Sequence, residues 1–222
     1  FYEGTGWFSR TFTVPSDWRG RRVALRFEGV NYHASVWLNG ESVGTHDDGF
    51  LPFEFAVQDL LQWNEENLLV VRVDNLSREG EVPGVKVGWR NEGGILREVR
   101  LIATDPVHVS HLSTTAEPTA EGGALTLRAE IANERPAPAT VLLKARVMRN
   151  DETLASFESG TARCAAGESV ELSLEGTVPD AVPWTPARPE LYSLHAELWG
   201  DGRPVDARTV RIGFRCIEVR DA

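Results

Sequence analysis

The stretch Ala34-Ser-Val-Trp-Leu-Asn-Gly-Glu-Ser-Val43 decides the fold class of this chain. Its apolar segments, 34–38 and 41–43, flank the dipeptide Asn39-Gly40. Asn-Gly supplies the pair of positive φ angles that a type I′ turn requires, and the twist of that turn matches the twist of the strands it joins. The sequence therefore predicts a tight β-hairpin over residues 34–43.

The same two-residue period of apolar side chains runs through the rest of the chain. In residues 22–28, Val23, Leu25 and Phe27 alternate with more polar neighbours, and because successive strand side chains point to opposite faces, this segment reads as a half-buried strand. Similar alternation occurs over 125–131, 141–147, 170–174 and 210–214. No segment keeps a helical spacing of apolar residues for three turns, and at most one helical turn is expected near 57–63. The sequence predicts an all-β protein built of sandwiches.

The chain is long enough for two domains. Its 222 residues exceed the usual domain length of roughly 100–200 residues. The best boundary is Thr104-Asp105-Pro106, because an apolar strand ends just before it, the residue before a proline is pushed out of helix, and a new alternation starts at Val107. We expect one domain over residues 1–105 and a second over 106–222. The length of the second domain suits an immunoglobulin-like sandwich of roughly seven strands.

Composition excludes several classes of partner. The net charge is −10, from 33 acidic and 23 basic residues, and the basic residues are scattered singly, so we expect no nucleic-acid partner. No segment approaches the roughly 20 apolar residues of a membrane helix, so we expect no membrane partner. The first residues read as a strand, which leaves the localisation open. Cys164 and Cys216 favour two buried free thiols over a single disulfide bridge.

Five ordered motifs cover the first half of the chain: Gly6-Trp-Phe-Ser-Arg-Thr-Phe-Thr-Val-Pro15, Leu25-Arg-Phe-Glu-Gly-Val-Asn31 with 34–40, Val43-Gly-Thr-His46 with Gly49-Phe-Leu-Pro-Phe-Glu-Phe55, Asn67-Leu-Leu-Val-Val-Arg-Val-Asp-Asn75, and Trp89-Arg-Asn-Glu-Gly-Gly-Ile-Leu-Arg-Glu-Val99. This set resembles the sugar-binding domain of glycoside hydrolase family 2, the group of β-galactosidases, β-glucuronidases and β-mannosidases. The second half resembles the immunoglobulin-like domain of that family through Trp184-Thr-Pro186, Pro189-Glu-Leu-Tyr192 and Gly213-Phe-Arg-Cys-Ile-Glu-Val219. The resemblance implies a jelly-roll β-sandwich followed by an immunoglobulin-like β-sandwich.

In the resembled family a catalytic barrel follows the second β-domain. It carries two carboxylates about 5–5.5 Å apart that perform retaining hydrolysis of terminal β-linked sugars. This chain stops three residues after Val219, so we expect no catalytic residue and no glycosidase activity in it. The resemblance implies the carbohydrate substrate and the catalytic barrel as partners in the full-length enzyme, and no cofactor. The resembled enzymes are often dimers or tetramers, which makes a homo-oligomer a further expectation.

Trp89, Arg90 and Asn91 are the candidates for substrate contact. Trp stacks on the apolar face of a sugar, and Arg and Asn offer hydrogen bonds to hydroxyl groups. In the resembled galactosidases, an Asp two residues before this Trp helps to hold substrate and a sodium ion. Val87 stands at that position here, which argues against a galactosidase substrate and against sodium binding. A core or interdomain wedge is an equally good interpretation of Trp89, because Trp side chains are usually mostly buried.

Other motifs favour structural interpretations. Asp47 and Asp48 beside Gly49 offer oxygen ligands, but calcium takes roughly 6–8 of them, so calcium is a weak hypothesis and a solvated loop is the stronger one. Trp7 and Trp37 lie in strand patterns, and we expect them in the core rather than in a sugar-binding aromatic platform.

Two rival functions stay open at this point. The first is a stand-alone carbohydrate-binding module, with a sugar site complete within residues 1–105. The second is an adhesion-type β-protein that binds another protein through an exposed apolar patch on a sheet face.

Overall fold

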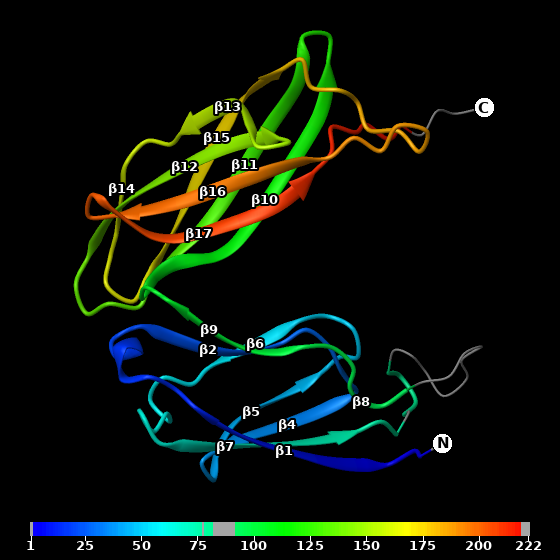
Figure 1. Cartoon of the computed structure of the whole chain (residues 1–222), viewed down its shortest axis with the longest axis vertical. Helices are drawn as coiled ribbons and strands as arrows, with labels where there is room; N and C mark the ends of the chain where they lie inside the picture. The colour runs from blue at the N-terminus through cyan, green and yellow to red at the C-terminus, as the bar shows by residue number, and fades with distance from the viewer. Residues whose placement is uncertain (1, 77, 82–91, 219–222) are drawn as a thin grey trace. The chain divides into compact units, whose positions relative to one another are not determined.

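The computed structural model describes residues 2–76, 78–81 and 92–218, and it contains two compact units, Phe1–Ala103 and Thr104–Ala222. Both units are built from strands (Figure 1). Within the described ranges, no helix is long and apolar enough to cross a membrane. The all-β prediction is confirmed, with a jelly-roll sandwich followed by an immunoglobulin-like sandwich.

The first unit is a sandwich of two principal sheets. One sheet has the strand order β1-β7-β4-β5, the other has the order β6-β2-β9, and β3 pairs with β8. Buried apolar side chains fill the space between the sheets, with Phe27, Val36 and Val71 among the most buried. The strands are β1 (Thr5–Thr13), β2 (Arg22–Phe27), β3 (Val30–Asn31), β4 (His33–Leu38), β5 (Glu41–Asp47), β6 (Phe53–Ala56), β7 (Glu66–Asp74), β8 (Gly94–Ile95) and β9 (Val99–Thr104).

The predicted hairpin is confirmed. Strands β4 and β5 pair antiparallel, with Leu38 opposite Glu41, and Asn39 and Gly40 have φ angles of 54° and 88°. The Asn39 side chain also donates to the carboxamide oxygen of Asn67, at 2.8 Å, which ties the turn to the start of β7. The local turn preference and the long-range packing therefore agree on one register.

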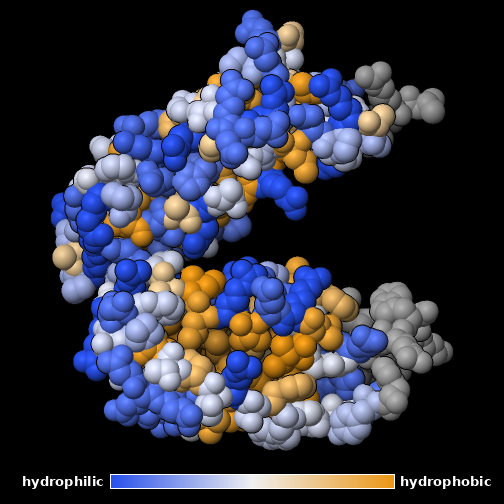
Figure 2. All heavy atoms as spheres, in the orientation of Figure 1, coloured by the Kyte–Doolittle hydropathy of each residue, from blue (hydrophilic) through white to orange (hydrophobic). Residues whose placement is uncertain are grey.

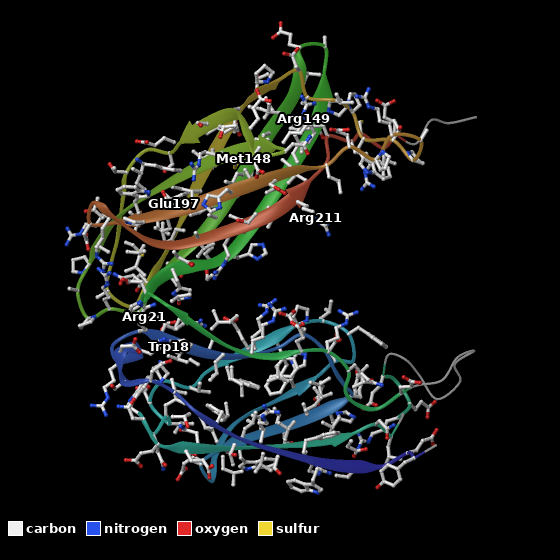
Figure 3. The ribbon with its side chains drawn as sticks, in the orientation of Figure 1. Trp18, Arg21, Met148, Arg149, Glu197 and Arg211 are labelled. Atoms are coloured by element: carbon white, nitrogen blue, oxygen red, sulfur yellow. The ribbon has the colours of Figure 1, made fainter. Side chains whose placement is uncertain are left out.

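A short 3₁₀ helix, η1 (Ser16–Trp18), was not predicted. The N–H of Arg21 donates to the carbonyl of Trp18, and both residues are labelled in Figure 3. The helical turn expected near 57–63 is only a hydrogen-bonded turn, in which the Leu60 N–H donates to the Val57 carbonyl at 3.0 Å.

The first unit is open along one side. Strands β1 and β9 are the edges of their sheets, and between them lies an apolar groove of about 520 Å³. Figure 2 shows hydrophobic side chains gathered on the visible face of this unit. Apolar side chains from β1, β2, β7, β8 and β9 line the groove: Phe8, Phe12, Leu25, Leu69, Val71, Ile95, Val99 and Leu101.

The second unit is also a two-sheet sandwich. Its sheets have the orders β10-β11-β15 and β13-β12-β16-β17, and β14 also pairs with β12. The core includes Tyr192 and Phe214, whose rings meet edge to face with centroids 5.3 Å apart. The strands are β10 (Val107–Thr119), β11 (Gly122–Asn133), β12 (Ala139–Arg149), β13 (Glu152–Glu158), β14 (Ala162–Cys164), β15 (Ser169–Pro179), β16 (Tyr192–Gly200) and β17 (Arg203–Ile212).

Three expectations about single residues, those for Trp7, Trp37 and Cys216, are wrong. Trp7 is not in the core: its exposed fraction is 63%, because β1 is an edge strand whose alternation turns Phe8 toward the groove and Trp7 outward. Trp37 is half-buried on the same outward face, between the buried Val36 and Leu38. Cys164 is a buried free thiol as expected, but Cys216 is exposed, after the end of the last strand.

Candidate functional site

The predicted contact residues Trp89, Arg90 and Asn91, together with Val87, lie outside the described residues. The structure does describe the residues on both sides of the segment 82–91. Two groups of side chains hold those flanking residues to the first unit. We call the group around Asp74–Glu81 the N-terminal anchor and the group around Glu92–Gly94 the C-terminal anchor.

Buried asparagine side chains form the C-terminal anchor. Asn31, at the end of β3, is fully buried, and its amide nitrogen donates to the Glu92 carbonyl at 2.7 Å. In the β3–β8 pair, Asn31 lies opposite Gly94. A carboxamide can satisfy a backbone carbonyl deep in a protein without bringing in a charge, and a buried polar group that keeps its partner avoids a large desolvation cost.

Asn75 completes the C-terminal anchor. A Cβ atom at Gly93 would lie 2.4 Å from Cβ, Cγ and Nδ2 of Asn75, so only glycine fits beside this side chain. Asn75 is itself held in place by Gly4. The carboxamide oxygen of Asn75 accepts from the Gly4 N–H at 2.8 Å, and the backbone N–H of Asn75 donates to the Gly4 carbonyl at 3.3 Å. The backbone just after the segment 82–91 is therefore fixed by packing as well as by hydrogen bonds.

Ion pairs form the N-terminal anchor. The guanidinium of Arg78 lies 3.0 Å from the Asp74 carboxylate and 3.5 Å from that of Glu81. Glu81 also contacts Nε2 of His33 at 3.0 Å, and Nδ1 of His33 contacts the Asp47 carboxylate at 2.8 Å. Arg78 contacts His33 as well. Strand ends that are far apart in the sequence, those of β4, β5 and β7, thus meet the residues that precede the segment.

The electrostatics of this anchor favour an ionised Asp74. Burial acts to raise the pKa of Asp74, but the N–H of Leu76 and the charge of Arg78 outweigh it and hold the pKa below its ordinary value. The carboxylates of Asp74, Glu81 and Asp47 each already contact a basic side chain. They are therefore suited to fixing the backbone rather than to acid–base chemistry on a substrate.

The weak calcium candidates Asp47 and Asp48 are directed to different partners. Asp47 contacts His33, whereas the Asp48 carboxylate accepts the N–H groups of Phe50 at 2.7 Å and Leu51 at 3.0 Å. Those two hydrogen bonds lower the pKa of Asp48. No group of three or more His, Cys, Asp or Glu side chains that could hold a metal ion occurs in the described part of the chain.

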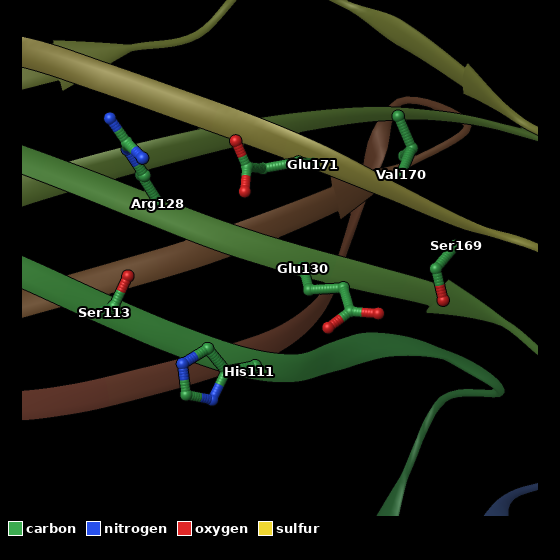
Figure 4. A pocket seen from close by; sticks show the side chains of 7 residues that line it. All are labelled: His111, Ser113, Arg128, Glu130, Ser169, Val170 and Glu171. Carbon is green, nitrogen blue, oxygen red and sulfur yellow. The ribbon is translucent and has the colours of Figure 1, made fainter.

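A second concavity lies on the outer face of the sheet β10-β11-β15 in the second unit (Figure 4). It has a volume of about 270 Å³, and three adjacent strands contribute His111, Ser113, Arg128, Glu130, Ser169, Val170 and Glu171. His111 lies opposite Glu130, which lies opposite Glu171. Its side chains are mainly polar and exposed, as is usual for the solvent face of an antiparallel sheet.

Family comparisons agree with the two-sandwich architecture. The family model described as the sugar binding domain of glycosyl hydrolases family 2 matches residues 1–105, and a second model, described as glycosyl hydrolases family 2, matches residues 107–215. The chain belongs to glycosyl hydrolase family 2. The resemblance stated from the ordered motifs is therefore confirmed.

Relatives and solved structures show how much of such enzymes this family 2 chain covers. A β-glucuronidase of Formosa agariphila is 26% identical over 96% of this chain and 24% of its own length. A β-galactosidase of Bacteroides ovatus is 28% identical over 96% of this chain and 25% of its own length. The crystal structure of a Bacteroides uniformis β-glucuronidase matches with a TM-score of 0.86 and 28% identity, over 96% of this chain and 26% of that one. The chain thus spans about a quarter of the length of these relatives.

Sequence reasoning singled out the segment but missed its anchors. Asn31 and Asn75 belong to quoted motifs and His33 lies between two of them, yet the partners of these three residues lie 14 to 71 residues away in the sequence. Asn31 is the last residue of β3 and Asn75 follows the last residue of β7, so neither asparagine breaks the alternation of apolar residues within a strand. Polar residues at the ends of apolar strands were the available signal.

Proposed function

We propose that this chain forms the two non-catalytic N-terminal domains of a β-glycosidase. In that enzyme the domains, 1–105 and 106–222, support the catalytic barrel, and the first places the segment 82–91 at one wall of the substrate pocket. The carrying observation is that both sides of this segment are fixed to one unit, by Asn31 and Asn75 after it and by Arg78 and His33 before it. A loop that bears binding residues works best on a rigid support.

The reaction of the whole enzyme is proposed to be retaining hydrolysis of a terminal β-linked sugar. Family membership and the names of the relatives, β-glucuronidase and β-galactosidase, support this class of substrate. Within the segment we assign Trp89 to stacking on the sugar ring, and Arg90 and Asn91 to hydrogen bonds with its hydroxyl groups. Val87 supplies no carboxylate, so we assign no sodium ion to this wall.

The catalytic carboxylates are proposed to lie in the barrel and outside this chain. Purified 222-residue chain and the longer natural protein would be assayed side by side with 4-nitrophenyl β-galactoside and β-glucuronide. We expect the chain alone to release no nitrophenol above a buffer blank, and the longer protein to hydrolyse at least one substrate. Hydrolysis by the chain alone would show that the catalytic groups lie within residues 1–222. A longer protein without any activity on β-glycosides would contradict the assigned reaction.

A further inference from the structure

An exposed aromatic pair stands on the outer face of the sheet β1-β7-β4-β5. The rings of Trp7 and Trp37 are stacked, with centroids 5.6 Å apart and planes inclined by 27°. Trp7 nevertheless keeps an exposed fraction of 63%. Trp37 thus covers one face of the Trp7 indole and orients it, while much of the remaining surface of Trp7 is open to solvent.

Polar groups suited to hydroxyl recognition surround this pair. In the strand register, Trp7 lies opposite Arg72, and Arg72 lies opposite Ser35 on β4. Ser9 is exposed and lies two residues from Trp7 along β1, so strand alternation puts it on the same face as Trp7. The Arg72 guanidinium lies 3.4 Å from the Thr5 hydroxyl and 3.9 Å from Asp74, both long contacts, so its N–H groups keep hydrogen-bonding capacity.

We propose that this face is an accessory glycan-binding surface, on which a pyranose ring stacks against Trp7 and hydrogen-bonds to Arg72. The aromatic ring supplies the contact for the apolar C–H face of the sugar, and the guanidinium and serine hydroxyls supply partners for its hydroxyl groups. Because Trp37 already orders the Trp7 side chain, little rotamer entropy is lost on binding.

The small exposed aromatic area of this surface favours a sugar over a protein as its ligand. An indole buries at most about 150–250 Å², and half-buried Trp37 offers less than that, whereas a stable protein interface buries about 800 Å² on each partner. Val70, opposite both Ser9 and Trp37, and Leu68, two residues from it on β7, add apolar area to this face, whereas Ser9, Arg72 and Ser35 interrupt it. A single sugar ring is matched to the size of the exposed indole.

The position of the surface connects it to the proposed substrate path. Asp74 of the N-terminal anchor is two residues from Arg72, or about 7 Å along β7. The proposed surface therefore lies next to the N-terminal anchor on the same strand. The choice of a glycan as ligand rests on the proposed function, but the surface itself contains no residue of that segment, so the two can fail independently.

The test is native electrophoresis of the 222-residue chain through gels that contain β-1,4-galactan, β-1,4-xylan or hydroxyethyl cellulose. We expect at least one polymer to slow the chain, Trp7→Ala to remove the retardation, and Trp7→Phe to keep part of it. In fluorescence titrations with a hexasaccharide of the same polymer, Trp7→Ala should raise Kd at least ten-fold. Both Trp7 variants should retain the thermal midpoint of the parent chain, because this side chain is mostly exposed.

Trp199→Ala is the matched control. Trp199 is a half-buried strand tryptophan of the other unit, hydrogen-bonded to Glu197 (labelled in Figure 3) and covered by Lys144, and its replacement should leave the retardation unchanged. The proposal is overturned if none of the three polymers slows the chain, or if Trp7→Ala is slowed as much as the parent. It is also overturned if light scattering shows a dimer that Trp7→Ala abolishes, because the face would then be an interface between two copies. Loss of binding here would leave the assignment of Trp89 untouched.

Discussion

Gly93→Ala tests the C-terminal anchor of the segment 82–91. The added Cβ would lie 2.4 Å from three atoms of Asn75, a distance that Cβ atoms do not tolerate. Asn75 has little room to withdraw, since its exposed fraction is 6% and its carboxamide oxygen holds the Gly4 N–H at 2.8 Å. Either this hydrogen bond breaks or the backbone at residue 93 moves. Overpacking of this kind costs about 1–3 kcal/mol.

The assay is thermal unfolding of the 222-residue chain, followed by circular dichroism. For a unit of about 100 residues, each kcal/mol lowers Tm by about 4–8 °C, so we expect the transition of the first unit to fall by at least 4 °C. Gly6→Ala is the matched control, because its new Cβ would meet Phe8 at 3.5 Å, an ordinary contact. Combining Gly93→Ala with Asn75→Ala should cost less than the sum of the two single changes, since the second removes the atoms that clash. A Gly93→Ala transition equal to that of Gly6→Ala would refute the close packing of Asn75 on residue 93.

Further predictions concern single contacts. Asn67→Ala should lower the free energy of unfolding by about 2–4 kcal/mol in urea titrations, because it removes four hydrogen bonds of 2.8–3.1 Å from a fully buried carboxamide. The control Gln62→Ala, at an exposed side chain, should change the free energy of unfolding little. Burial acts to raise the pKa of Asp105, but the Val107 N–H, Arg135 and Arg203 outweigh burial and hold the pKa below the ordinary value of 3.8. The ionised carboxylate therefore stabilises the second unit above pH 3.8, and this stabilisation is lost as the pH falls through the folded-state pKa. Asp105→Asn should therefore destabilise the second unit at pH 7, and the difference from the parent chain should shrink below pH 3.8; a constant difference would contradict this. In native protein, a thiol reagent should label the exposed Cys216 quickly and Cys164 only after unfolding, because burial both shields Cys164 and raises its pKa; equal labelling rates would contradict the burial.

Short-range signals predicted much of the fold. The Asn39-Gly40 turn and the alternation of Val23, Leu25 and Phe27 specify hairpins and half-buried strands locally, and the structure has both. The orientation of β1 was not predictable in the same way, since Trp7 and Phe8 are both apolar and neighbours in sequence. Which of them faces inward depends on the partner strand and on the edge position, neither of which the local pattern contains.

The candidate site was predictable only in part. Residue chemistry pointed to Trp89, Arg90 and Asn91, which lie outside the described residues, and their assignment stays a proposal. The anchors depend on contacts across the fold, such as Asn31 with Glu92 and His33 with Glu81, and a single sequence carries no periodic signal for them.

The most direct test of the central claim is kcat/KM of the longer natural protein carrying Trp89→Ala, measured on the better of the two nitrophenyl glycosides. If the segment 82–91 forms a wall of the substrate pocket, kcat/KM should fall at least about ten-fold, which corresponds to about 1.4 kcal/mol of lost transition-state binding. The Tm of this variant and the kcat/KM of the Trp199→Ala control should stay at the parent values. An unchanged kcat/KM for Trp89→Ala would contradict the account, and so would a loss of activity that merely follows a lowered Tm, because Trp89 would then be a structural wedge.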